Sequence, residues 1–101
     1  MFGLSKLFGP KTDFSQLIKD GAVIIDVRTA GEFAEGHING SKNISVDKIQ
    51  SSLAIIKKFN KPVIACCRSG ARSAMAVKFL KSAGIDAYNG GPWTSLENEL
   101  R

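Results

Sequence analysis

The sequence has few of the residues that build metal sites and disulfide frameworks. Its 101 residues include one histidine and two cysteines, and the cysteines, Cys66 and Cys67, are adjacent. Adjacent cysteines do not make an ordinary disulfide framework, and a lone histidine lacks the partners that a zinc site needs. The sequence therefore predicts free thiols, which suit a reducing compartment, the cytoplasm.

Long apolar runs and clusters of positive charge are also absent. No stretch reaches the ~18 apolar residues of a membrane span, and residues 1–9 lack the apolar core and cleavage site of a secretory signal. The net charge is +5, but the lysines are spread among the predicted helices and do not form a run with aromatic residues. We therefore expect no membrane span and no nucleic-acid partner, and we interpret the positive charge as a solvated surface that attracts small anions.

Strands and helices alternate along the chain, and 44% of the residues are hydrophobic, enough for one compact core. The predicted strands cover residues 22–27, 42–46, 62–66 and 85–88. The predicted helices cover residues 13–19, 30–35, 48–59, 73–83 and 93–100. This order predicts an α/β fold with a parallel sheet and helices on both faces. Residues 13–101 are expected to form the domain, and residues 1–12 a loosely ordered N-terminal segment.

The most informative segment runs from Cys67 to Ser73. It follows an apolar strand, contains Gly70 and two arginines, and leads into a helix, so Cys67 lies where a strand ends near a helix amino terminus. Unpaired N–H groups and the positive helix end favour anions there and lower the pKa of a thiol. Cys67 is predicted to open a polar loop as a nucleophile, whereas Cys66 is predicted to be a buried core residue.

Three segments together resemble the rhodanese (thiosulfate sulfurtransferase) family: residues 26–44, the loop at residues 67–73, and Asn89-Gly90-Gly91. The resemblance implies a stand-alone, small rhodanese-like domain with a parallel sheet, conventionally five-stranded, and an active-site cysteine that opens a six-residue loop. Met1–Pro10 makes a poor version of the family's first edge strand, so four to five strands are expected. Pro92-Trp93 also departs from the family pattern, in which the aromatic residue falls later.

The resemblance implies that Cys67 attacks the sulfane sulfur of thiosulfate or a related small anionic donor and becomes a persulfide. Cyanide or a thiol, protein thiols included, would then accept the sulfur, and no metal or organic cofactor is required. The predicted substrate-binding residues are those of the loop: Arg68, Ser69, Gly70, Ala71 and Arg72. Arg72 has an open alternative, because it could instead face outward or pair with an acid.

Several polar residues near the motifs are interpreted as structural. An acid, a histidine and a cysteine would suggest a catalytic triad, but their place in the first motif implies ion pairs and hydrogen bonds of the fold. The residues concerned are Asp26, Arg28, Glu32 and His37. Ser73 is interpreted as a helix-start residue.

Two other functions stay open. The spacing from Cys66 to Arg72 also fits the pattern of cysteine-dependent phosphatases, some of which have a rhodanese-like fold, and would make Cys66 the nucleophile. We prefer Cys67, because residues 62–66 fill a typical strand length and leave a tight loop that suits sulfur better than phosphate. The second alternative is a non-catalytic rhodanese-like binding module.

Overall fold

The structure is a computed structural model, and it describes residues 11–101. The prediction of a loosely ordered segment at residues 1–12, with a poor edge strand at Met1–Pro10, therefore falls almost entirely outside the described residues.

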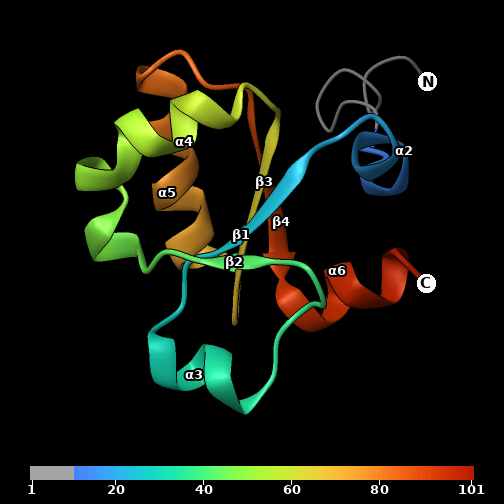
Figure 1. Cartoon of the computed structure of the whole chain (residues 1–101). Helices are drawn as coiled ribbons and strands as arrows, with labels where there is room; N and C mark the ends of the chain where they lie inside the picture. Colours follow the sequence, from blue (N-terminus) through green and yellow to red (C-terminus); the bar gives the residue numbers. More distant parts are fainter. Residues whose placement is uncertain (1–10) are drawn as a thin grey trace, which may run out of the picture.

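The described residues form one parallel sheet with helices around it (Figure 1). The sheet has four strands in the order β2-β1-β3-β4, and every neighbouring pair is parallel. The strands are β1 (Val23–Asp26), β2 (Lys42–Asn43), β3 (Val63–Cys67) and β4 (Ala87–Pro92). The helices are α2 (Phe14–Lys19), α3 (Ala30–Glu35), α4 (Leu53–Phe59), α5 (Ala71–Ser82) and α6 (Trp93–Glu99), with 3-10 turns η1 (Val46–Lys48) and η2 (Gln50–Ser52). This arrangement confirms the predicted fold class.

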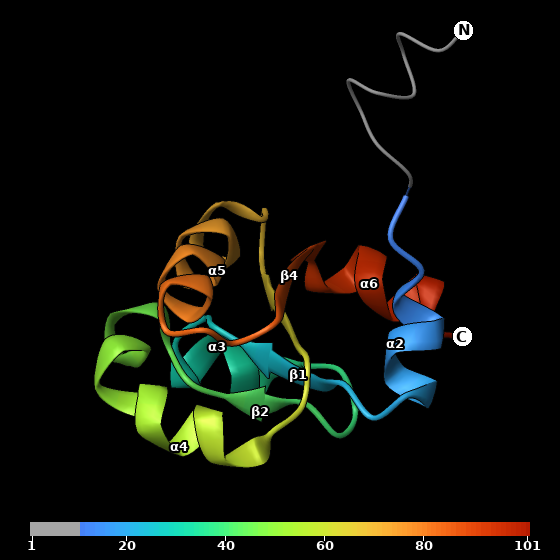
Figure 2. The same ribbon diagram turned by 90° about the horizontal axis from the view of Figure 1, so that it is seen from above.

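Each face of the sheet is covered by a different pair of helices, α4 and α5 on one side and α2 and α6 on the other (Figure 2). Neighbouring strand residues point to opposite faces, so Ile25 packs toward α4 and α5, whereas Ile24 packs toward α2 and α6. Burial of both faces explains why β3, and β1 up to Asp26, are apolar runs with no polar alternation.

The segment at residues 48–59 differs from its prediction as one long helix. The turn η1 ends at Lys48, the turn η2 covers Gln50–Ser52, and only Leu53–Phe59 is α-helical. The Ser51 hydroxyl donates to the Lys48 carbonyl oxygen at 3.1 Å, the kind of local hydrogen bond with which serine competes against a regular helix. Ile49 and Ile56 of this segment are buried in the core.

The last strand and the helix before it also differ from prediction. Strand β4 extends to Pro92, beyond its predicted end at residue 88, with a register irregularity where it passes Ala65 and Cys66 of β3. A Cβ on Gly90 would lie 2.9 Å from side-chain carbons of Ile64 and Leu96, so this glycine allows close packing in the added part of the strand. Helix α5 starts at Ala71, earlier than predicted, with Gly70 as its N-cap residue.

The predicted strand at residues 42–46 is shorter, because β2 contains only Lys42 and Asn43. Asn43 donates its side-chain N–H to the carbonyl oxygens of Asp26 and Arg28, at 3.1 and 2.9 Å. These bonds tie the short strand to the end of β1. No helix of the described residues is long and apolar enough to span a membrane.

Candidate active site

Cys67 lies at the carboxyl end of β3, the edge of a parallel sheet where ligands usually bind. It is the last residue of the strand and has no exposed surface. The prediction that Cys67 is the first residue of the loop is off by one position, because Cys67 still belongs to the strand and is buried. The ladder extends one residue further than predicted, because Cys67 pairs with Pro92 at the end of the lengthened β4.

The Cys67 sulfur has two polar neighbours. The Gly70 backbone N–H donates to Sγ at 3.0 Å, and the Ser73 hydroxyl oxygen lies 3.4 Å from Sγ. Gly70 has a φ of +103°, a conformation that costs glycine little and that turns its N–H toward the sulfur.

The pKa of the Cys67 thiol reflects burial opposed by these hydrogen bonds. Burial favours the neutral thiol and raises the pKa, whereas the Ser73 hydroxyl and the backbone N–H groups of Ser73, Gly70 and Ser69 stabilise the thiolate. The hydrogen bonds outweigh burial, so the pKa lies below its ordinary value. The predicted direction is therefore found, with hydrogen bonds as its cause.

Cys66 points to the other face of the sheet, where it packs with Ile64 and Leu96. It is completely buried, as predicted. Burial, with a smaller contribution from the negative charge of Asp26, raises the pKa of its thiol to about 12. Cys66 is therefore held as a neutral core thiol.

The two loop arginines have different surroundings. Arg72 forms a two-pronged pair with Glu32 of α3, with N···O distances of 2.8 and 3.1 Å, so the alternative of pairing with an acid is the one observed. Glu32 is also held by Thr29 in a capping box at the start of α3. Hydrogen bonding to Arg72, and then to the Thr29 backbone, lowers the pKa of Glu32 to about 2. Arg68 is exposed and has no side-chain hydrogen bond or ion pair within residues 11–101.

Ser73 and Asn89 belong to the site although the sequence analysis gave neither a chemical role. Ser73 is completely buried, and its hydroxyl donates to the Asn89 Oδ1 atom at 2.6 Å. The sequence carried a signal for Ser73, because residues 73, 76, 77 and 80 have the spacing of one buried helix face. Asn89 belongs to the third segment of the family resemblance, but its spacing gives no sign of a contact with Ser73, which exists because β4 lies beside β3.

Asp26, Arg28 and His37, which the sequence analysis interprets as structural, form ion pairs, hydrogen bonds and ring contacts within the fold. Asp26 and Arg28 form a buried ion pair at 2.6 Å, and the Arg28 guanidinium lies 4.7 Å from the centre of the Trp93 ring. His37 is exposed, bonds through Nδ1 to the Phe33 carbonyl oxygen and stacks on the Phe33 ring. Neither Asp26 nor His37 hydrogen bonds to Cys67, so these residues form no triad with it.

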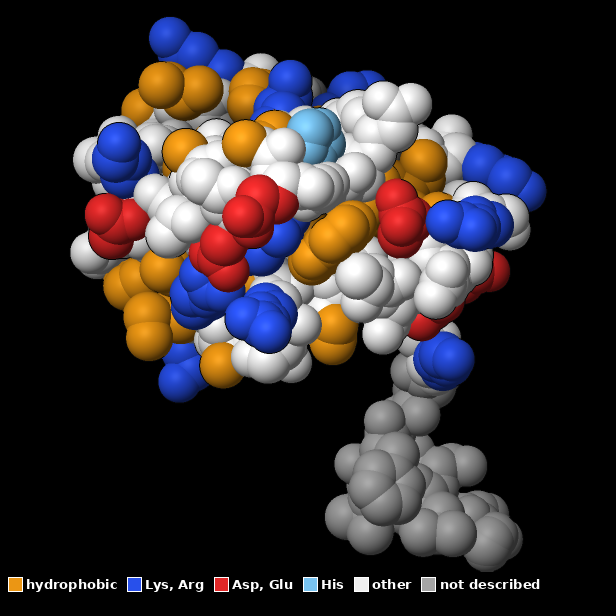
Figure 3. All heavy atoms as spheres, turned by 90° about the horizontal axis from the view of Figure 1, so that it is seen from below, with side chains coloured by type: hydrophobic (Ala, Val, Ile, Leu, Met, Phe, Trp, Pro, Cys, Tyr) orange, Lys and Arg blue, Asp and Glu red, His pale blue; other side chains and the backbone are white. Residues whose placement is uncertain are grey.

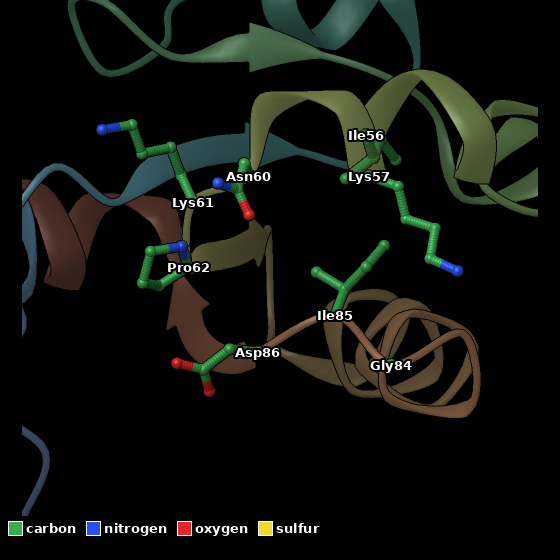
Figure 4. Close-up of a pocket in the computed structure, with 8 residues that line it drawn as sticks. All are labelled: Ile56, Lys57, Asn60, Lys61, Pro62, Gly84, Ile85 and Asp86. Carbon is green, nitrogen blue, oxygen red and sulfur yellow. The ribbon is translucent and has the colours of Figure 1, made fainter.

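The hollow in Figure 4 and the face in Figure 3 differ from the cysteine site. Figure 4 shows a hollow at the amino end of the sheet, the edge opposite Cys67, since its lining includes Pro62 and Asp86, which immediately precede β3 and β4. Its lining contains no residue of the cysteine loop. On the face seen in Figure 3, acidic and basic side chains are intermixed, without the uniform basic patch that a nucleic-acid interface needs.

Comparison with known proteins agrees with this fold. The family model of the rhodanese-like domain matches residues 11–91, and the chain belongs to that family. The thiosulfate sulfurtransferase GlpE of Pseudoalteromonas translucida is 34% identical over 83 residues, which cover 80% of this chain and 78% of that protein. The relationship thus supports sulfur transfer as the general class of activity.

Two solved structures extend the comparison. A rhodanese-related protein from Thermoplasma volcanium has a TM-score of 0.74 and 31% identity, with 86% of each chain covered. The human single-domain sulfurtransferase TSTD1 has a TM-score of 0.64 and 30% identity, with 75% of this chain and 80% of that chain covered.

Proposed function

We propose that this protein is a thiosulfate sulfurtransferase that carries the transferred sulfur as a persulfide on Cys67. The observation that carries the proposal is the environment of the sulfur at the carboxyl edge of the sheet. The Gly70 N–H donates to Sγ and the Ser73 hydroxyl oxygen lies within hydrogen-bond distance of it, and the pKa of the thiol is lowered although the residue is buried. A thiolate is the reactive form of cysteine.

The reaction has two steps. The Cys67 thiolate attacks the outer sulfur of thiosulfate, a new S–S bond forms, and sulfite leaves with the electron pair of the broken S–S bond. An acceptor thiolate or cyanide then attacks the outer sulfur of the persulfide, and the electron pair of that S–S bond returns to Sγ. Each step forms one bond to the transferred sulfur and breaks another, so the reaction needs no oxidant, reductant or cofactor.

Arg68 is the cation available to an anionic donor. Arg72 is engaged with Glu32, whereas Arg68 is exposed at the rim of the loop beside Ser69. Guanidinium groups suit oxyanions because they donate two parallel hydrogen bonds. Arg68 would therefore attract the donor, and Arg72 would hold the loop against α3. The backbone of Ser69, Gly70 and Ala71 would line the path to the sulfur.

The phosphatase alternative does not fit the position of Cys66. A phosphatase nucleophile must be ionised and face the loop, whereas Cys66 lies on the α2 and α6 side of the sheet with its pKa raised to about 12. Both cysteines are free thiols, so we also propose a reducing compartment, the cytoplasm, as the place where the protein works.

The test is intact-mass measurement after incubation with thiosulfate and removal of excess donor. We expect the wild-type protein and the Cys66→Ala variant to gain the mass of one sulfur atom, and the Cys67→Ser variant to gain none. Cyanide should remove the added mass and release thiocyanate. An adduct that persists in Cys67→Ser would overturn the assignment, and the lack of any adduct on the wild-type protein would favour the binding module.

A further inference from the structure

The Ser73 hydroxyl has one hydrogen and three acceptors within reach. Its oxygen lies 2.6 Å from Asn89 Oδ1, 3.1 Å from the Gly70 carbonyl oxygen and 3.4 Å from Cys67 Sγ. The Gly70 carbonyl already accepts from the Ala74 N–H at 3.0 Å and from Asn89 Nδ2 at 3.2 Å. Because a carbonyl oxygen has two lone pairs, the hydroxyl hydrogen is effectively shared between Asn89 and Cys67.

The orientation of the Asn89 amide is held by the backbone on both sides. Its Nδ2 donates to the Gly70 carbonyl oxygen at 3.2 Å, and its Oδ1 accepts from the Gly91 N–H at 2.9 Å. A flip of the amide would break both bonds and place two oxygens together. Asn89 therefore presents a fixed acceptor to Ser73, and this acceptor cannot become a donor.

The direction of the hydroxyl hydrogen must depend on the state of the sulfur. A neutral thiol can donate its S–H to the Ser73 oxygen while the hydroxyl donates to Asn89, so both hydrogen bonds form. When the S–H bond breaks, the proton leaves to a solvent base and the electron pair stays on Sγ. The thiolate needs the Ser73 hydrogen, and the Ser73 and Asn89 oxygens are then left 2.6 Å apart with no hydrogen between them.

We propose that Asn89 is a positioning residue that competes with Cys67 for the Ser73 hydroxyl hydrogen. Its amide oxygen takes this hydrogen while the sulfur is protonated, and loses it when the sulfur is a thiolate. In the persulfide the charge moves to the outer sulfur, so the hydroxyl returns to Asn89. On the proposed function, which this last step assumes, Asn89 would disfavour the resting thiolate and favour the loaded persulfide.

The charges around Cys67 do not supply this effect. Of the two loop arginines, Arg72 extends from α5 and is paired with Glu32 of α3, whereas Arg68 is exposed to solvent and is unchanged in every variant of the test below. Asp26 of β1 is paired with Arg28. Cys66, the other nearby titratable group, stays neutral on the opposite face. Asn89 itself carries no charge, so any effect on the titration of Cys67 must pass through hydrogen bonds.

The test is the pH dependence of Cys67 alkylation, without a sulfur donor, in Asn89→Ala, Ser73→Ala and the double variant. Asn89 is exposed, so in Asn89→Ala a water molecule takes the place of the amide. Unlike the fixed amide oxygen, water can turn and donate a hydrogen to the Ser73 oxygen. We expect Asn89→Ala to lower the midpoint of the pH profile of alkylation, with a thiolate fraction at acidic pH about three to ten times that of the wild type. Ser73→Ala should raise the midpoint, and the double variant should match Ser73→Ala.

The double variant is decisive, because the effect of Asn89 should vanish once Ser73 has no hydroxyl. Asn98→Ala, at an exposed position of α6, is the control and should leave the midpoint unchanged. Asn89→Leu, which keeps the bulk without the acceptor, should lower the midpoint as Asn89→Ala does. An unchanged or raised midpoint in both Asn89 variants, or an effect that persists without Ser73, would overturn the proposal. Since alkylation needs no sulfur donor, this result is independent of whether the protein transfers sulfur.

Discussion

Removal of the buried guanidinium of Arg28 should be among the most damaging single changes in this domain. Arg28 donates to both carboxylate oxygens of Asp26, with a closest distance of 2.6 Å, and to the Gly36 carbonyl oxygen at 2.7 Å. Asp26 has no exposed surface, and Arg28 is 5% exposed. In Arg28→Met the aliphatic bulk remains, but the Asp26 carboxylate is left buried without its partner.

The expected loss of stability follows from that burial. Breaking a buried ion pair by removing one partner costs about 3–5 kcal/mol, mostly because the remaining charge is uncompensated. Domains of this size have total stabilities of about 5–15 kcal/mol, so the variant should retain only part of its folding free energy. At about 4–8 °C per kcal/mol for a domain of this size, the melting temperature should fall by roughly 12 °C or more.

Urea unfolding at neutral pH, followed by circular dichroism, measures this loss. The control is Arg101→Met, which removes an exposed arginine whose distance to Glu97 is 3.8 Å and should cost no more than about 0.5 kcal/mol. Adding Asp26→Asn to Arg28→Met should restore part of the stability, because the unpaired charge is gone while an acceptor for the Arg28 backbone N–H remains.

Two results would refute this account. If Arg28→Met cost less than about 1 kcal/mol, the pair could not be a buried structural contact of the strength argued. If the double variant lost as much stability as the two single variants together, Asp26 would not be the group left unsatisfied.

Further predictions concern the loop and the sheet. Iodoacetamide should label Cys67 in the native protein, and thiosulfate should protect it, while Cys66 stays unlabelled until unfolding; equal labelling of both would show that the loop does not activate Cys67. Arg68→Ala should weaken turnover with thiosulfate more than transfer from a neutral polysulfide, and equal losses with both donors would assign the arginine to positioning. As pH falls, Glu32 should protonate near 2 in the folded protein instead of near 4.5, so the stability that Glu32 contributes is complete above pH 4.5 and is lost between these values. A pH titration of the free energy of unfolding should show this loss in the wild-type protein, and the Glu32→Gln variant should not show it. Gly90→Ala should cost about 1–3 kcal/mol in urea unfolding, because its Cβ would lie 2.9 Å from two side chains, and a neutral result would mean that β4 adjusts freely.

Local sequence patterns were sufficient for the alternation of strands and helices and for the separation of the two cysteines. The apolar runs and the glycine and capping signals depend on near neighbours in the chain, and so does the rule that adjacent strand residues face opposite sides. These patterns placed Cys66 in the core and Cys67 at the start of the polar loop, within one residue of its position. The cysteine motif also identified the class of chemistry.

Tertiary structure decided what the site residues contact. The pairing of Arg72 with Glu32 joins residues forty positions apart, and the bond from Ser73 to Asn89 exists only because β4 lies beside β3. No local pattern could show that Asn-Gly-Gly continues a strand, because the close packing of Gly90 against Ile64 and Leu96 involves two other elements. The sequence by itself indicated which cysteine to propose as the nucleophile, whereas the packing of distant segments determined which groups surround its sulfur and which arginine stays free, because hydrogen bonds and ion pairs depend on distances in space.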